Sequence, residues 1–377
     1  MTEPERPQLP VSDGRMLTGH VAEWGELLNV LQHRRGLTVV CADPWSGSSP
    51  LLAGALAESG GAHVLADARR CTDALDLAMT IADSAVASLT PDAYGWWVGD
   101  APPNSAAGLR VWRSLSLQGV DLDGIRLGEG RGPDRLLEAV ELVAALADGP
   151  GTLAIDHLGV MLANTRGAAG REILSLLRTG RQRHPELDLI LVDQPTGVVS
   201  DALGDSRHPL YHAGERLRIT RPTPDRFISD LMITRPMVQE PVPMLRAAAE
   251  IAAGVPALIW RIVDHAPAEG EHTARAVAGW QALRDATAPS VRQEWDLLRR
   301  VHPAAMSLVS AISLGLPPHS IPAASKSVDD GLNRLRDVRL AWQPEPRRWA
   351  IADPLLAAYA RQYAPAWATR RSAYGRS

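Results

Sequence analysis

Short apolar segments alternate with amphipathic helical patterns through the first 220 residues, and this alternation constrains the fold more than any other feature. Four segments are apolar enough to be buried on both sides, and they are residues 37–42, 63–67, 152–156 and 187–193. A fifth strand is expected at 215–220. Buried strands separated by helices are typical of a mostly parallel sheet covered by helices on both faces. The sequence therefore predicts a three-layer α/β domain.

Composition excludes several classes of protein. Hydrophobic residues make up 45% of the chain and charged residues 22%, as in ordinary folded proteins. The sequence has no apolar run of about 18 residues, so no membrane span is expected. The N-terminal segment MTEPERPQLP lacks the apolar core of a signal peptide. Cys41 and Cys71 are too few for a disulfide framework or a cysteine-based zinc site, and a reducing, cytoplasmic location is expected.

A turn-forming segment follows the first predicted strand, at the place where a phosphate-binding loop is expected. The intact motif reads G-x-x-x-x-G-K-[ST], and residues 42–49 read ADPWSGSS. Gly47 and Ser49 match the motif, Ala42 replaces its first glycine and Ser48 replaces its lysine. Backbone N–H groups and the helix N-terminus still attract an anion there, and the Ser49 hydroxyl is a candidate magnesium ligand. Loss of the lysine ammonium costs roughly 1.5–3 kcal/mol of binding.

The third predicted strand resembles the second motif of nucleotide-hydrolysing enzymes. Its sequence TLAID ends in Asp156, a carboxylate expected to bind magnesium directly or through water. Hydrolytic enzymes usually have glutamate at the next position, where this chain has His157. Asp193 and Gln194 end the following strand, where a polar sensor of the γ-phosphate is expected.

In their order and spacing these motifs resemble those of the STAND branch of AAA-like P-loop ATPases, and within it the archaeal-type ATPases with a winged-helix C-terminus. LTGHVAEWGELLNVL is similar to the N-terminal "hhGR-x-x-E-h" box, with His20 in place of arginine. Gly254–Pro256 is similar to the GxP motif, whose proline contacts adenine in that branch. IADPLLAAYAR resembles the segment that follows the wing. The resemblance extends over about residues 16–363.

The resemblance implies a three-layer P-loop NTPase domain with an ASCE-type parallel sheet, followed by a helical lid and a winged helix. The expected divisions are a flexible arm (1–14), the NTPase-like domain (15–235), the lid (236–290), the winged helix-turn-helix (291–365) and a tail (366–377). It also implies that ATP or ADP with Mg²⁺ is bound by Gly47, Ser48, Ser49, Asp156, Asp193, Gln194 and Pro256. The altered lysine, glutamate and arginine make the chain a degenerate member, with no significant ATP hydrolysis expected.

The C-terminal region is basic and has the pattern of a winged helix. Residues 291–377 contain 13 Lys and Arg against 7 Asp and Glu, while the whole chain has a net charge of −4. Three helical segments precede a hairpin expected at 340–352. The candidate DNA contacts are Asn333, Arg334, Arg336 and Arg339 on the third helix and Arg347 and Arg348 on the wing. Asp329 and Asp330 on the same helix reduce its charge, so packing against the core or a protein partner is the other interpretation.

Three hypotheses for function follow from these patterns. The first is a regulatory or scaffold protein that has a protein partner, does not associate with membranes, and has a degenerate nucleotide-binding core. The second is an active ATPase whose loop is completed in a homo-oligomer, by an arginine such as Arg178, Arg181 or Arg183. The third is a winged-helix DNA-binding regulator in which the core serves for dimerisation.

Overall fold

The computed structural model forms two compact units. It describes residues 18–33, 36–89, 132–165, 168–193, 198–234, 240–338, 340–345 and 348–364. The sheet unit consists of Ala22–Ala42 and Ser49–Arg218. The C-terminal unit consists of the chain up to Val21, the loop Asp43–Ser48 and the chain from Ile219 onward.

A five-stranded sheet forms the centre of the sheet unit, as the sequence predicts. Its strands are β1 (Leu37–Ala42), β2 (Ala62–Asp67), β3 (Gly151–Asp156), β4 (Leu187–Asp193) and β5 (Glu215–Ile219). They lie in the order β2-β3-β4-β1-β5, and the pairs β2·β3, β3·β4 and β4·β1 are parallel. Since the carboxyl ends of parallel strands meet at one edge, the polar residues that end β2, β3 and β4 share that edge.

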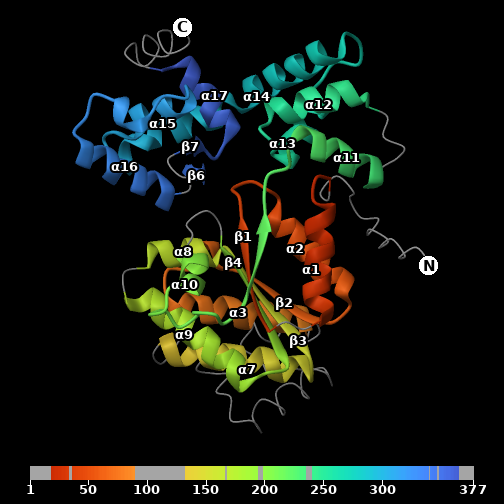
Figure 1. Cartoon of the computed structure of the whole chain (residues 1–377), viewed down its shortest axis with the longest axis vertical. Helices are drawn as coiled ribbons and strands as arrows, with labels where there is room; N and C mark the ends of the chain where they lie inside the picture. The colour runs from red at the N-terminus through yellow and green to blue at the C-terminus, as the bar shows by residue number, and fades with distance from the viewer. Residues whose placement is uncertain are drawn as a thin grey trace, which may run out of the picture. The chain divides into compact units, whose positions relative to one another are not determined.

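Helices cover both faces of this sheet (Figure 1). They are α1 (Val21–His33), α2 (Ser48–Ser59), α3 (Ala74–Leu89), α7 (Gly132–Ala147), α8 (Leu158–Asn164), α9 (Ala168–Arg183) and α10 (Val198–Gly204). Leu37 and Val39 of β1 join one apolar core with α3, α7, α8, α9 and α10. Val40, which points to the opposite face of the strand, is buried outside that core. Trp24 of α1 packs directly on Gly54 of α2, so these two helices form the other layer.

The C-terminal unit is mainly helical and has one continuous apolar core. Its helices are α11 (Pro224–Thr234), α12 (Val242–Ile251), α13 (Pro256–Asp264), α14 (His272–Val301), α15 (Ala305–Ser313), α16 (Ser325–Asp337) and α17 (Pro354–Gln362). The antiparallel strands β6 (Ala341–Glu345) and β7 (Arg348–Ile351) follow α16. This helix-then-hairpin order is consistent with the winged helix that the sequence predicts.

The expected boundary between lid and winged helix falls inside a single helix. α14 is 30 residues long and continues through Pro289 and across position 290 without a break. The segments that the sequence assigns to the lid and to the winged helix therefore share this helix. The predicted arm 1–14 and tail 366–377 lie outside the described residues. None of the described helices combines the length and the apolar character needed to cross a bilayer.

Candidate functional site

The loop between β1 and α2 has a backbone conformation that favours glycine at position 47. Gly47 has a φ of 88°, in the left-handed region. Trp45 also has a positive φ, 61°, which is unusual for a large side chain, and its side chain is 57% exposed. Ser46 between them is only 1% exposed, and in the described part of the chain its Oγ has no hydrogen-bond partner. The loop thus combines strained backbone with one buried, unsatisfied hydroxyl.

Two side chains of the C-terminal unit hold this loop by its carbonyl oxygens. His20 Nε2 donates to the Ser46 carbonyl oxygen at 2.6 Å. Arg221 Nε donates to the Pro44 carbonyl oxygen at 2.6 Å, and the Arg221 backbone N–H donates to Asp43 Oδ2 at 3.2 Å. Burial lowers the pKa of Arg221 to about 10, so it remains charged at neutral pH. His20, which stands where the resemblance has arginine, therefore helps to fix the loop.

The lysine position is occupied by a short, buried side chain. Ser48 is the first residue of α2 and is only 3% exposed, and Ser49 beside it is half-buried. The chain's one lysine, Lys326, lies in α16. The N-terminus of α2 and the unsatisfied Ser46 hydroxyl still fit an anion such as a phosphate, because helix dipole and N–H groups favour negative charge. The loop therefore has backbone and hydroxyl groups that suit an anion, and position 48 lacks the ammonium of the intact motif.

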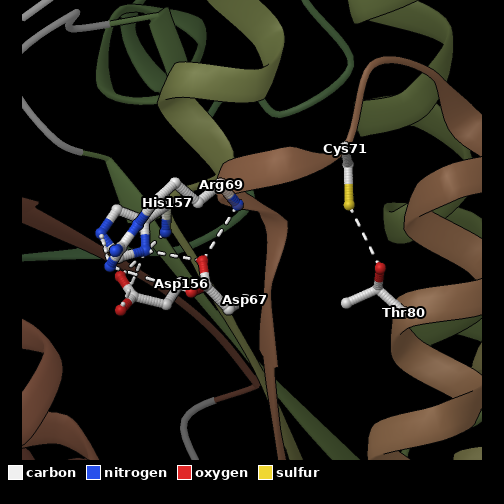
Figure 2. A network of polar contacts seen from close by, with 6 residues as sticks. All are labelled: Asp67, Arg69, Cys71, Thr80, Asp156 and His157. Carbon is white, nitrogen blue, oxygen red and sulfur yellow. Dashed lines mark hydrogen bonds and ion pairs between the residues drawn. The ribbon is translucent and has the colours of Figure 1, made fainter.

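A network of polar contacts surrounds the second motif (Figure 2). Asp156 ends β3, and His157 follows in a left-handed conformation with φ 60° and ψ 19° before α8 begins. Asp156 Oδ1 accepts the His157 backbone N–H at 2.8 Å. The His157 ring Nδ1 lies 2.9 Å from Asp67 Oδ1 and 3.2 Å from Asp156 Oδ2. On its other side, His157 Nε2 lies 3.1 Å from Arg69 Nη2.

These partners determine which nitrogen of His157 carries the proton. A guanidinium can only donate, so Nε2 facing Arg69 is the acceptor. The proton of the neutral imidazole is then on Nδ1, toward Asp67 and Asp156. The carboxylate of Asp156 thus accepts the backbone N–H of His157, and its other oxygen lies within ion-pair distance of the ring.

Such a carboxylate does not fit the role of a magnesium ligand. Its Oδ1 accepts a backbone N–H, and its Oδ2 faces the ring nitrogen that carries the proton. Nor do three or more His, Cys, Asp or Glu side chains come together as a metal site anywhere in the described ranges. Among the residues that the structure describes, Asp156 and Ser49 thus lack the further carboxylate or histidine ligands of a metal site.

Asp193, at the end of β4, accepts a hydrogen bond from the first turn of α10. Its Oδ2 accepts the Ser200 backbone N–H of α10 at 2.8 Å. It lies beside Cys41 of β1 in the sheet register. Burial first, and the Asp193 carboxylate second, raise the pKa of the Cys41 thiol. The neighbouring sensor candidate, Gln194, lies outside the described residues.

Pro256, the adenine candidate, is buried and is the first residue of α13. The preceding Gly254 has a φ of 71°, and a Cβ there would lie 2.3 Å from the Pro222 carbonyl oxygen. Close packing against Pro222 therefore requires glycine, independently of any ligand.

The DNA-contact candidates present charges of both signs. Asn333 and Arg334 of α16 and Arg348 of β7 are exposed, Arg336 is half-buried, and Arg339 and Arg347 lie outside the described residues. On the same helix, Asp329 Oδ1 lies 3.4 Å from His319 Nε2, and Asp330 is exposed. The net positive charge of the α16 and β7 surface is thus smaller than its arginines alone would give.

Two of the three arginines of the oligomer hypothesis bind groups of their own chain, whereas the buried Nε of Arg181 has no hydrogen-bond partner among the described residues. Arg178 Nη1 donates to the Pro209 carbonyl oxygen, and Arg183 Nη1 pairs with Glu141 Oε1 at 2.9 Å. In the described structure these two guanidiniums stabilise the sheet unit.

Three residues of these networks are not identified by the sequence patterns. Asp67 ends a predicted strand. Because β2 pairs with β3, Asp67 lies opposite Asp156 in the sheet, and this register identifies it as a member of the network. Arg69 and Arg221 belong to no motif, and only the three-dimensional fold brings them to His157 and to the loop.

Comparison with solved structures supports the fold. The Walker-type ATPase PABY2304 of Pyrococcus abyssi superimposes with a TM-score of 0.62 and 18% identity, over 95% of this chain and 99% of that one. The Aeropyrum pernix ORC2 protein and Cdc6p of Pyrobaculum aerophilum give TM-scores of 0.46 and 0.42 with 13% and 14% identity, over 97% and 98% of this chain and 96% of each of theirs. Our fold assignment rests on the first of these. No protein-family model matches the sequence, and no curated protein matches it. The chain has the fold of a Walker-type ATPase.

Proposed function

We propose that this protein is a regulatory or scaffold protein whose P-loop-type core binds adenine nucleotide weakly and does not hydrolyse it. The observation that carries the proposal is the position of His157. It stands where hydrolytic enzymes usually have glutamate, and its ring is held between Asp67, Asp156 and Arg69. Its Nε2 faces a guanidinium, so it is poorly placed to accept a proton from water.

The phosphate loop supports weak binding. Gly47, the N-terminus of α2 and the Ser46 hydroxyl favour a phosphate group, and the ammonium that normally binds the β- and γ-phosphates is absent. Losing one charged contact of roughly 1.5–3 kcal/mol weakens binding roughly ten- to a hundred-fold. Because that ammonium distinguishes ATP from ADP, both nucleotides are expected to bind with similar affinity.

Calorimetry with ADP and with ATP tests the binding part. We expect micromolar-to-millimolar affinity, and little change on adding Mg²⁺ because the Asp156 carboxylate is already engaged. Gly47→Asp should abolish binding by placing a negative charge on the loop. Gly61→Asp is the matched control, because Gly61 is exposed and has open space around it. Failure of both nucleotides to bind at millimolar concentration would remove nucleotide from the proposal.

A steady-state phosphate-release assay tests the proposal that the chain does not hydrolyse ATP. Turnover by the purified chain should equal background, whether or not Mg²⁺ is present. Turnover of about 1 per second that Asp156→Ala abolishes would overturn the proposal and favour the active-ATPase alternative.

DNA is a second candidate partner, supported by the exposed Asn333, Arg334 and Arg348 on the helix and hairpin of the C-terminal unit. If these residues bind the backbone, affinity for duplex DNA should fall with rising salt and weaken in Arg334→Gln. Affinity that is independent of salt would favour the protein-partner interpretation.

A further inference from the structure

A cavity of about 350 Å³ lies in the C-terminal unit, beside the indole of Trp45. Its apolar wall includes Val255, Leu258, Val291 and Leu355, from α13, α14 and α17. Its size is at the lower end of the range of small-molecule sites. The walls alone would accept any small apolar group.

Charged side chains of both signs also line the cavity. Arg261 extends from α13, Glu294 from α14, and Asp353 caps the N-terminus of α17 by accepting the Leu355 N–H at 2.7 Å. Within the described ranges, neither Glu294 nor the Arg261 guanidinium takes part in a hydrogen bond or an ion pair. Arg261 is exposed to solvent and its charge acts on Asp353, whereas Glu294 is half-buried. The cavity thus presents charges of both signs to a ligand that carries both.

The pKa shifts of the two carboxyl groups, Glu294 and Asp353, agree with a ligand that carries a positive charge. Burial raises the pKa of Glu294, and the nearby Asp353 raises it further. Burial also raises the pKa of Asp353, against the opposing effects of the backbone N–H groups and of Arg221 and Arg261. A cationic group placed between them would relieve this cost.

Strain in the loop supplies an independent observation. Trp45 has a positive φ of 61°, which is costly for a bulky residue, and its ring is 57% exposed while lining the cavity. Backbone strain concentrates at ligand contacts and switch regions. The indole is a ready stacking surface for an apolar or cationic group.

We propose that this cavity binds a small zwitterion of the apolar α-amino-acid type. Its ammonium faces Glu294 and Asp353, its carboxylate faces Arg261, and its side chain lies on the apolar wall beneath Trp45. The cavity includes Trp45 of the phosphate loop and Val255 next to Pro256. However, its charged groups, Glu294, Asp353 and Arg261, belong to neither motif. The proposal therefore does not depend on nucleotide binding.

Calorimetry on the full chain tests the assignment, with L-leucine as the probe. Isoamylamine keeps the ammonium of leucine and lacks the carboxylate. 4-Methylpentanoate keeps the carboxylate and lacks the ammonium. We expect leucine to bind at least about tenfold more tightly than either analogue, because each analogue leaves one charged group unpaired.

Two substitutions on α14 test whether leucine binding depends on the carboxyl group in the cavity or only on the charge of the helix. Glu294→Gln should weaken leucine binding by about tenfold or more, since it removes the charge and keeps the shape. Asp296→Asn, two residues away on the exposed face, should leave binding unchanged. Absence of heat with leucine at millimolar concentration would overturn the proposal. An unchanged affinity in Glu294→Gln, or equal affinity for isoamylamine, would overturn it as well.

Discussion

At the scale of single residues, Gly47 is the position where one methyl group should matter most for the loop. Its φ of 88° is strained for any side chain, although a Cβ would meet nothing within 4 Å. We therefore expect Gly47→Ala to lower the free energy of unfolding by about 1 kcal/mol through backbone strain alone. Urea denaturation followed by circular dichroism measures the change.

Gly25 is the matched control for this prediction. It lies in α1, where a Cβ also has open space and the backbone is helical. Gly25→Ala should raise the free energy of unfolding by about 0.5–1 kcal/mol. Equal effects of the two substitutions would show that the conformation of the loop does not matter for stability.

Sequence spacing identified Ser48 and His157 as the altered positions, because motif residues stand at fixed distances from predictable strands. It did not identify what holds His157. Asp67 and Arg69 reach the ring from β2 and the turn after it, and this depends on the pairing of β2 with β3. Long-range register of this kind leaves no local pattern in a single sequence.

At the scale of the element, α14 carries a carboxyl group that is costly to ionise. Because the pKa of Glu294 is raised in the fold, the folded chain binds its proton more tightly than the unfolded chain does. The cost is therefore fully present above the raised pKa and disappears as the pH falls toward the ordinary value of 4.5. Glu294→Gln should raise the melting temperature at pH 7, by an amount that shrinks toward pH 4.5.

Thermal unfolding of both proteins across this pH range measures the difference. Asp296→Asn is again the control, because Asp296 is exposed on the same helix. A stabilisation that grows on acidification would contradict the assigned direction of the pKa shift.

The elements themselves were predictable to different degrees. The strands of the sheet are apolar runs bounded by turn residues, and all five lie where the sequence predicts them. The extent of α14 was not predictable, because Pro289 resembles a helix boundary. Burial of Val291, Trp295 and Leu298 in the same core continues the helix past the proline.

At the scale of the whole molecule, Arg221 connects segments of the C-terminal unit that are far apart in sequence. It donates to the Pro44 carbonyl oxygen of the loop and, through Nη2 at 2.5 Å, to the Ala352 carbonyl oxygen after β7. Its guanidinium also lies 5.5 Å from the ring centre of Trp342. Arg221→Met keeps much of the packing and loses these bonds, so we expect the free energy of unfolding to fall by about 2–3 kcal/mol.

Chemical denaturation compares this variant with Arg300→Met. Arg300 is exposed on α14, so its replacement should change stability by less than about 0.5 kcal/mol. If Arg221→Met also left stability unchanged, the contacts of the guanidinium with the loop and the hairpin would be energetically neutral.

The uninterrupted course of α14 has a consequence for how the C-terminal unit comes apart. This helix packs against α12 and α13 and also against α15 and α17, and Trp295 and Leu298 beyond Pro289 belong to the same apolar core as α12 and α13. When a continuous helix loses its packing partners at one end, it loses buried contacts that also stabilise its other end. The segments before and after residue 290 are therefore expected to unfold as one cooperative unit, and a fragment cut at residue 290 would expose the apolar core that they share.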